Sequence, residues 1–217
     1  MLDVEIRASA AAPLSRSGAL AGTWAALIAA FGVAAFGVVQ VLQLVGATKP
    51  PLDAILIYAT SLVIAPPFLV AMVALHYATP ALRRFWSHVA LSFATIYAVF
   101  AALMYVSQLA SVIPATLAGG DVPMLLTDAP HSLFWTIDAL AYIAMGCAAA
   151  FALGAIQRRR EPTAWWFCLA HAVMTPVIAV VYFSPTFSVV LLLLGTPWLF
   201  TALGMTLALA ALLRRAA

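Results

Sequence analysis

The sequence predicts an all-α membrane protein: a polytopic bundle of six transmembrane helices that forms a single integral membrane domain over residues 1–217. Of the 217 residues, 66% are hydrophobic and only 8% are charged. A soluble domain has about 25% charged residues. Mean hydropathy is +1.10. About 20 consecutive apolar residues span a bilayer, and six runs of at least roughly that length can be drawn.

Short polar or turn-forming stretches separate these runs. The predicted spans are residues 18–45, 54–79, 85–117, 131–156, 163–183 and 187–213, so the bundle covers residues 18–213. The third span is the longest. Residues 1–17 precede the first span with both acidic and basic side chains and no cleavage site of the kind that ends a signal peptide. They are predicted to be a short cytoplasmic segment.

Three of the spans contain helix-breaking residues. Pro66–Pro67 lies in the second span, Pro176 in the fifth and Gly195–Trp198 in the sixth. A proline inside a membrane helix frees a backbone carbonyl, which a hydroxyl, a water or a ligand can then satisfy. These positions are predicted to be packing kinks or parts of a cavity wall.

The basic residues predict the orientation of the bundle. Lys49 is alone on one side, and the other side carries Arg7, Arg16, Arg83, Arg84, Arg158, Arg159, Arg160, Arg214 and Arg215. By the positive-inside rule, both termini are predicted to be cytoplasmic. The protein is therefore expected in the cell membrane, as a multi-pass protein of a bacterial or archaeal inner membrane. The net charge of +3 is scattered between apolar runs, so no nucleic-acid partner is predicted.

The longest outer loop is residues 118–130, AGGDVPMLLTDAP. It combines turn-forming residues with an apolar patch and two acids, Asp121 and Asp128. Two interpretations are open. The loop is either an ordinary interfacial connection or a short lid over the mouth of the bundle.

The fourth span carries the most informative polar residues. His131 and Asp138 are seven positions apart, which places them on one face of a helix, and Trp135 and Tyr142 continue that face. Asp138 is the only acid well inside a predicted span. A carboxylate in hydrocarbon is costly, so it normally faces a protein interior or a wet cavity.

The third span supplies partners for this face. Tyr105 and Gln108 lie in its outer half, at the depth where the fourth span begins. Consecutive spans joined by a modest loop are usually antiparallel neighbours. Tyr105, Gln108, His131, Asp138 and Tyr142 are therefore predicted to converge.

This convergence has two interpretations. Asp138 could accept hydrogen bonds from Tyr105 or Gln108 and so join two helices, which is worth about 1 kcal/mol. Alternatively, it could hold a ligand or relay a proton. An acid at this depth gives the second interpretation equal standing.

Two further candidates lie in the last two spans. His171 is near the middle of the fifth span, one turn before Thr175 and Pro176, and Trp198 lies within the sixth. No cofactor or metal site is predicted. Cys147 and Cys168 lack any paired spacing, and no nucleotide loop or histidine cluster is present.

Two segments also carry a resemblance. YVSQL, residues 105–109, together with PHSLFWTIDALAY, residues 130–142, resembles a group of uncharacterised bacterial and archaeal polytopic membrane proteins. The matching positions are Tyr105, Gln108, His131, Asp138 and Tyr142. The resemblance covers mainly the third and fourth spans, and it implies the membrane class without implying an activity.

The leading hypothesis is a protein that binds or transports a small molecule or lipid in an outer pocket. The predicted ligand-binding residues are Asp138, His131, Tyr105, Gln108, Tyr142, Trp135, His171 and Trp198. An alternative is an intramembrane isomerase or cyclase with Asp138 as general acid, assisted by Tyr105 or His171. Such an enzyme should enclose a pocket open to lipid.

A third class is a non-catalytic subunit of a membrane assembly, which should have a dry, tightly packed core. Besides the lipid bilayer, an oligomeric partner is predicted through the first span. Its small residues Gly32, Ala34–Ala35 and Gly37 form a plausible contact face.

Overall fold

A computed structural model describes residues 14–217. Most of the predicted N-terminal segment, including Arg7, lies outside the described residues. Within residues 14–217, every regular element is a helix, and six helical spans are long and apolar enough to cross a membrane. The predicted all-α class and the six spans are therefore confirmed.

The six candidate spans match the predicted ones to within four residues at each end, and the third and sixth are each divided into a long helix and shorter helical elements. The long helices are α2 (Arg16–Leu44), α3 (Leu52–Ala78), α4 (Arg84–Ser107), α6 (Leu133–Ala155), α7 (Pro162–Phe183) and α9 (Pro197–Arg215). The short elements are the 3-10 turns η1 (Ala81–Arg83) and η3 (Met124–Leu126), the π-helical turn η2 (Gln108–Val112), α5 (Ile113–Leu117) and α8 (Val189–Leu194).

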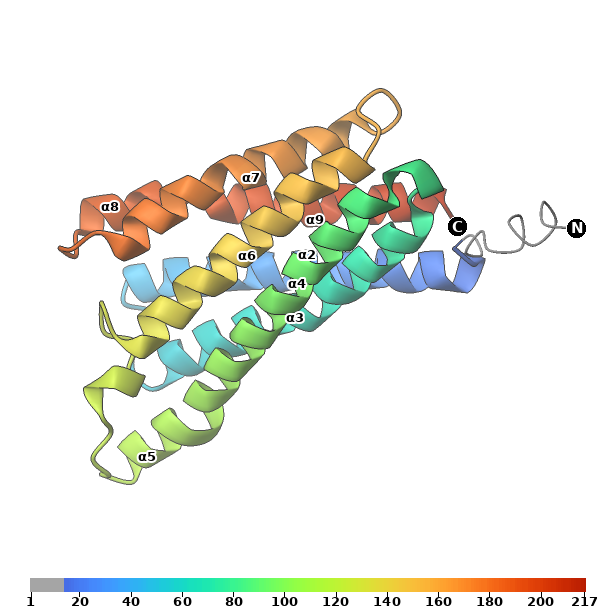
Figure 1. Cartoon of the computed structure of the whole chain (residues 1–217). Coiled ribbons are helices and arrows are strands. Elements are labelled where there is room, and N and C mark those ends of the chain that lie inside the picture. Colours follow the sequence, from blue (N-terminus) through green and yellow to red (C-terminus); the bar gives the residue numbers. More distant parts are fainter. Residues whose placement is uncertain (1–13) are drawn as a thin grey trace, which may run out of the picture.

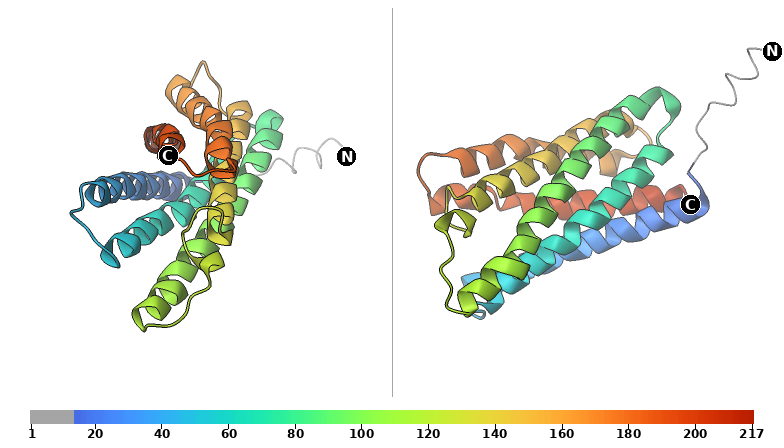
Figure 2. Two further views of the ribbon diagram at one scale, coloured as in Figure 1. Left: turned by 90° about the vertical axis from the view of Figure 1, so that its left-hand side faces the viewer. Right: turned by 60° about the horizontal axis from the view of Figure 1, so that its bottom comes forward.

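The long helices form a closed ring (Figures 1 and 2). Each packs against the next along the chain, and α9 returns to pack against α2. The chain enters α2 and leaves α9 at the same end of the bundle (Figure 1). We call this the arginine-bearing end, because Arg16, Arg83, Arg84, Arg158–Arg160, Arg214 and Arg215 lie there. The opposite end, with residues 45–51, 118–132 and 184–188, is the loop end.

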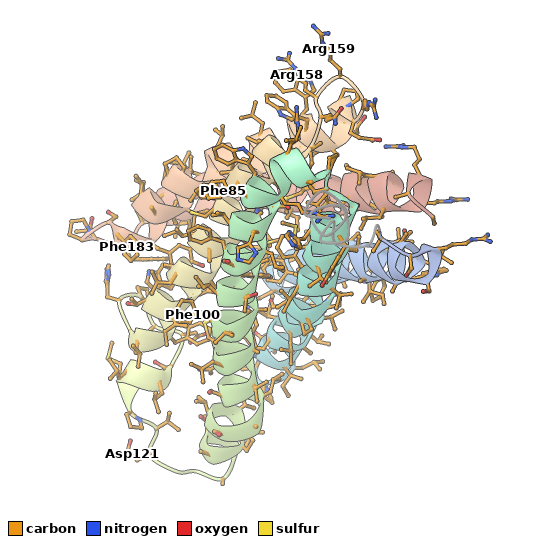
Figure 3. The ribbon with its side chains drawn as sticks, turned by 45° about the vertical axis from the view of Figure 1, so that its right-hand side comes forward. Phe85, Phe100, Asp121, Arg158, Arg159 and Phe183 are labelled. Carbon is orange, nitrogen blue, oxygen red and sulfur yellow. The ribbon has the colours of Figure 1, made fainter. Side chains whose placement is uncertain are left out.

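Figure 3 shows how charge is distributed between the ends. Arg158 and Arg159 stand at the tip of the α6–α7 connection, and Asp121 lies at the far end of the molecule. Between the ends, large apolar side chains such as Phe31, 70% exposed, face outward. An apolar exterior with charge gathered at its ends is the surface that a bilayer requires.

Small residues hold the helices close together toward the arginine-bearing end. A Cβ atom added to Gly22 of α2 would lie only 2.3 Å from the Cβ of Ala74 in α3. The buried core there is rich in alanine, including Ala26, Ala90 and Ala149. Such residues let helix backbones approach closely in a membrane. Toward the loop end the helices diverge (Figure 1).

The predicted contact face of the first span is occupied within the chain. A Cβ on Gly32 would lie 2.9 Å from Ile64 of α3, and one on Gly37 would lie 2.7 Å from Leu199 of α9. These glycines therefore serve packing inside the ring, and only Ala34 between them is exposed. Oligomerisation through this helix stays a prediction.

Two helices change geometry at the loop end. In the third span, Pro114 has no N–H to bond the carbonyl of Ala110, and the helix widens into η2, where Ile113 N–H bonds the carbonyl of Gln108. In the sixth span, α8 ends at Leu194 and α9 begins at Pro197. The predicted break at Gly195–Trp198 is confirmed.

Candidate functional site

The diverging helices enclose a cavity of about 740 Å³ at the loop end. Ligand sites typically have volumes of about 300–1,000 Å³. Every long helix contributes to the lining, for example through Gln40 (α2), Tyr58 (α3), Tyr105 (α4), Asp138 (α6), Tyr182 (α7) and Leu199 (α9). We call it the loop-end cavity. Its position follows from the fold, because the small residues that close the ring lie mainly toward the other end.

Asp138 is the most constrained polar group of the loop-end cavity. It lies in α6 and is only 8% exposed. Its Oδ1 accepts a hydrogen bond from the Tyr105 hydroxyl of α4 at 3.1 Å, and its Oδ2 accepts one from the Tyr182 hydroxyl of α7 at 2.6 Å. Both oxygens therefore receive a donor, which is the arrangement that an ionised carboxylate needs.

Aromatic rings surround this carboxylate. Tyr58 stacks on Tyr105 with ring centroids 6.1 Å apart, and its edge meets Phe134 at 5.6 Å. On the other side, Tyr142 meets Trp198 edge to face at 4.8 Å. These rings all line the loop-end cavity, so its wall offers both π-faces and phenolic hydroxyls.

Two other carboxylates line the same cavity. Asp53, buried at the start of α3, accepts from the Gln43 side-chain amide at 3.3 Å and from the Ala54 N–H at 2.8 Å. Asp128, in the outer loop, accepts from the Tyr58 hydroxyl at 3.2 Å. Three carboxylates therefore line the cavity.

The outer loop forms part of the cavity wall. The Gln108 side-chain amide donates to the Leu126 carbonyl at 2.6 Å, and Tyr58 holds Asp128. Thr127 and Asp128 line the loop-end cavity. Its apolar residues Met124, Leu125 and Leu126 are exposed, so the loop contributes only an edge of the cavity wall, and both interpretations of the loop stay open. Gln108 lines the loop-end cavity as predicted, but its amide bonds the loop, and of the two predicted donors to Asp138 only Tyr105 bonds it.

His131 does not join the predicted cluster. Helix α6 begins at Leu133 and is capped by Ser132, whose side chain accepts from the Trp135 N–H at 3.1 Å. His131 therefore lies in the preceding turn with φ of +64°, is exposed, and does not line the cavity. The seven-residue spacing from His131 to Asp138 was wrongly taken as one helical face.

Trp135 supports the site from outside. Its indole Nε1 donates to the Tyr182 carbonyl at 3.0 Å, and the two rings pack with centroids 4.6 Å apart. Trp135 does not line the loop-end cavity. It fixes the end of α7 that presents the Tyr182 hydroxyl to Asp138.

His171 lies apart from Asp138 and does not line the loop-end cavity. It is buried, its Nδ1 is 3.1 Å from the Thr201 hydroxyl, and its ring lies 5.9 Å from that of Trp198. Trp198 itself lines the cavity. The structure therefore brings five predicted residues to one cavity, namely Asp138, Tyr105, Gln108, Tyr142 and Trp198, and leaves His171 behind its wall.

Sequence reasoning missed Tyr182, Tyr58, Asp53 and Asp128 as site residues. Tyr182 and Tyr58 lie in predicted spans, in the half that also holds Asp138, so their depth was a usable signal. Asp53 and Asp128 lie at a span edge and in a loop, where acids are common and carry no signal by themselves. No group of three or more metal-ligating side chains occurs within the described part of the chain.

Comparison with known proteins gives no match: no family model, no curated protein and no solved structure is similar to this chain. The resemblance carried by residues 105–109 and 130–142 therefore stays a prediction.

Proposed function

We propose that this chain is a multi-pass protein of the cell membrane that binds a small molecule or lipid in the loop-end cavity. The observation that carries the proposal is a ligand-sized cavity lined by all the long helices, with Asp138 held in its wall by two tyrosines. A non-catalytic subunit would need no such space. An Asp138–Tyr105–His171 enzyme site receives no support, since His171 stands behind the cavity wall.

We propose further that both termini are cytoplasmic and that the loop-end cavity faces outward. All the described arginines lie at the arginine-bearing end, and Lys49 is the basic residue of the loop end. Arg158 also lies over the rings of Trp165 and Trp166, at 5.0 and 4.8 Å. Basic and aromatic residues together are typical of a cytoplasmic membrane interface.

Labelling of single cysteines in intact cells tests this orientation. After Cys147 and Cys168 are replaced by alanine, Gly120→Cys in the outer loop should react with a membrane-impermeant maleimide. Arg159→Cys in the α6–α7 connection should react only after the cells are broken. The reverse pattern would overturn the proposed orientation.

Ligand-dependent stabilisation tests the binding function. We expect at least one member of a panel of lipids and polar metabolites to raise the thermal midpoint of the purified wild type, and Asp138→Asn to lose this rise. Asp121→Asn is the matched control, because Asp121 is exposed and does not line the cavity. Equal responses in all three proteins, or none in the wild type, would refute a functional site at Asp138.

A further inference from the structure

The loop-end cavity carries acidic groups without basic ones. Residues 14–217 contain five acidic side chains, and three of them, Asp53, Asp128 and Asp138, line the cavity. No lysine, arginine or histidine of the described residues does so. The hydrogen-bond donors to the three carboxylates are tyrosine hydroxyls, a glutamine amide and a backbone N–H, all of which are neutral.

Of the three carboxylates, Asp53 and Asp138 are buried and Asp128 is exposed, and a buried charge is expensive at membrane depth. A buried carboxylate is normally paired with a cation or a metal, because neutral donors restore only part of its lost hydration. Asp138 is almost fully buried and has neutral partners only. A cationic ligand would supply the missing opposite charge.

The apolar part of the wall suits an organic cation more than a bare metal ion. Seven aromatic side chains of residues 14–217 line the cavity, among them Phe36, Tyr58, Phe134, Tyr142 and Trp198. A ring face attracts a cation placed over it, and aromatic cages are the usual sites for quaternary ammonium groups. The volume of about 740 Å³ exceeds what a single metal ion needs.

Trp198 offers the cavity its ring and not its N–H. Its side chain lines the cavity and is only 6% exposed, yet its indole Nε1 has no hydrogen-bond partner among the described residues. Buried indole N–H groups usually find an acceptor. The Nε1 atom is itself buried from solvent, so a ligand in the cavity meets the ring of Trp198 and not its N–H.

We propose, on the basis of the proposed binding function, that the ligand of the loop-end cavity is an organic cation, namely a substituted ammonium compound with an apolar body. Asp138 and Asp128 supply the opposite charge. The rings of Tyr58, Tyr142 and Trp198 enclose the ammonium group. Binding is non-covalent, so no co-reactant is needed.

The test compares charge at constant shape. Purified wild type in an uncharged maltoside detergent is titrated with choline, with the bulkier benzyltrimethylammonium, and with dimethylbutanol, the uncharged carbon isostere of choline. We expect the ammonium compounds to bind roughly tenfold or more tightly than the isostere, since a desolvated cation–π contact and an ion pair are both lost with the charge. Sodium chloride at equal ionic strength serves as the ionic control.

Variants locate the effect. Asp138→Asn should weaken ammonium binding and leave the affinity for the isostere unchanged. Asp128→Asn should do the same, and it replaces Asp138→Asn in the test if that protein fails to fold. Asp121→Asn, in the same loop as Asp128 but outside the cavity lining, should bind as the wild type does. Trp198→Phe replaces an indole with a ring that attracts cations less strongly, so it should lower the affinity for choline and for benzyltrimethylammonium alike and leave the affinity for the isostere unchanged.

The outcomes separate this inference from the proposed function. If the isostere binds as tightly as choline, or if only neutral or anionic lipids stabilise the protein, the inference of a cationic ligand is refuted. The proposed binding function then still stands. An equal response to sodium would replace the organic cation with an inorganic one and overturn the inference. No response to any of these compounds or to the lipid panel would overturn both.

Discussion

Asp138→Ala should lower the free energy of unfolding by about 2–3 kcal/mol, because it removes the acceptor of two phenolic hydroxyls. Each unsatisfied group costs about 1–3 kcal/mol, and the lower part of this range applies because Tyr182 is only partly buried. Tyr105 lies in α4 and Tyr182 in α7, so the variant loses one hydrogen bond between α6 and each of these helices. Reversible unfolding in mixed detergent micelles would measure the change.

Variants of the two tyrosines show whether Asp138→Ala is destabilised by unpaired hydroxyls or only by the space that the smaller side chain leaves. In Asp138→Ala, adding Tyr105→Phe and Tyr182→Phe should recover part of the loss, since no hydroxyl then remains unpaired. Tyr77→Phe is the matched control, because Tyr77 lies half exposed on α3, away from the cavity lining. Strictly additive losses in the triple variant would contradict the hydrogen-bonded network.

Asp138→Asn should behave differently from Asp138→Ala. An amide of nearly the same shape can still accept from one tyrosine and donate to the other. We therefore expect most of the stability to remain while the charge is gone. If hydrogen bonding were the sole role of Asp138, the asparagine variant would match the wild type in ligand response as well as in stability.

The sequence was sufficient for the number and approximate limits of the six spans. The contrast between apolar runs and their charged separators is strong, and in a bilayer almost nothing but a helix can satisfy the backbone of such a run. The contact between Tyr105 and Asp138 was also predictable, because consecutive spans pack side by side. Closure of the ring by α9 against α2 was not, since it depends on packing between the two ends of the chain.

The errors at the site have local causes. Ser132 is a good N-cap, and its preference for that position sets the start of α6 after His131. A helix that starts there cannot carry His131 on the face of Asp138. Gln108 lies where Pro114 forces a π-helical turn, and its amide reaches the loop carbonyl of Leu126 instead of the carboxylate.

Ala54→Trp should abolish ligand binding and cost the empty protein little stability. Ala54 lies on α3, lines the loop-end cavity and is partly buried. Enlarging a residue in a filled core typically costs about 1–3 kcal/mol, but here the indole can extend into existing space. A ligand would have to displace it, so we expect affinity to fall by roughly a hundredfold or more, given about 1.4 kcal/mol for each tenfold change.

Val70→Trp is the matched control for this variant. Val70 lies on the same helix, is exposed on the apolar exterior and does not line the cavity, so tryptophan there should face lipid and leave binding intact. Equilibrium titration of both variants, with thermal midpoints measured without ligand, would decide. Unchanged affinity in a folded Ala54→Trp protein would mean that the ligand binds elsewhere. The loop-end cavity would then reflect only the divergence of the helices beyond their alanine-rich contacts.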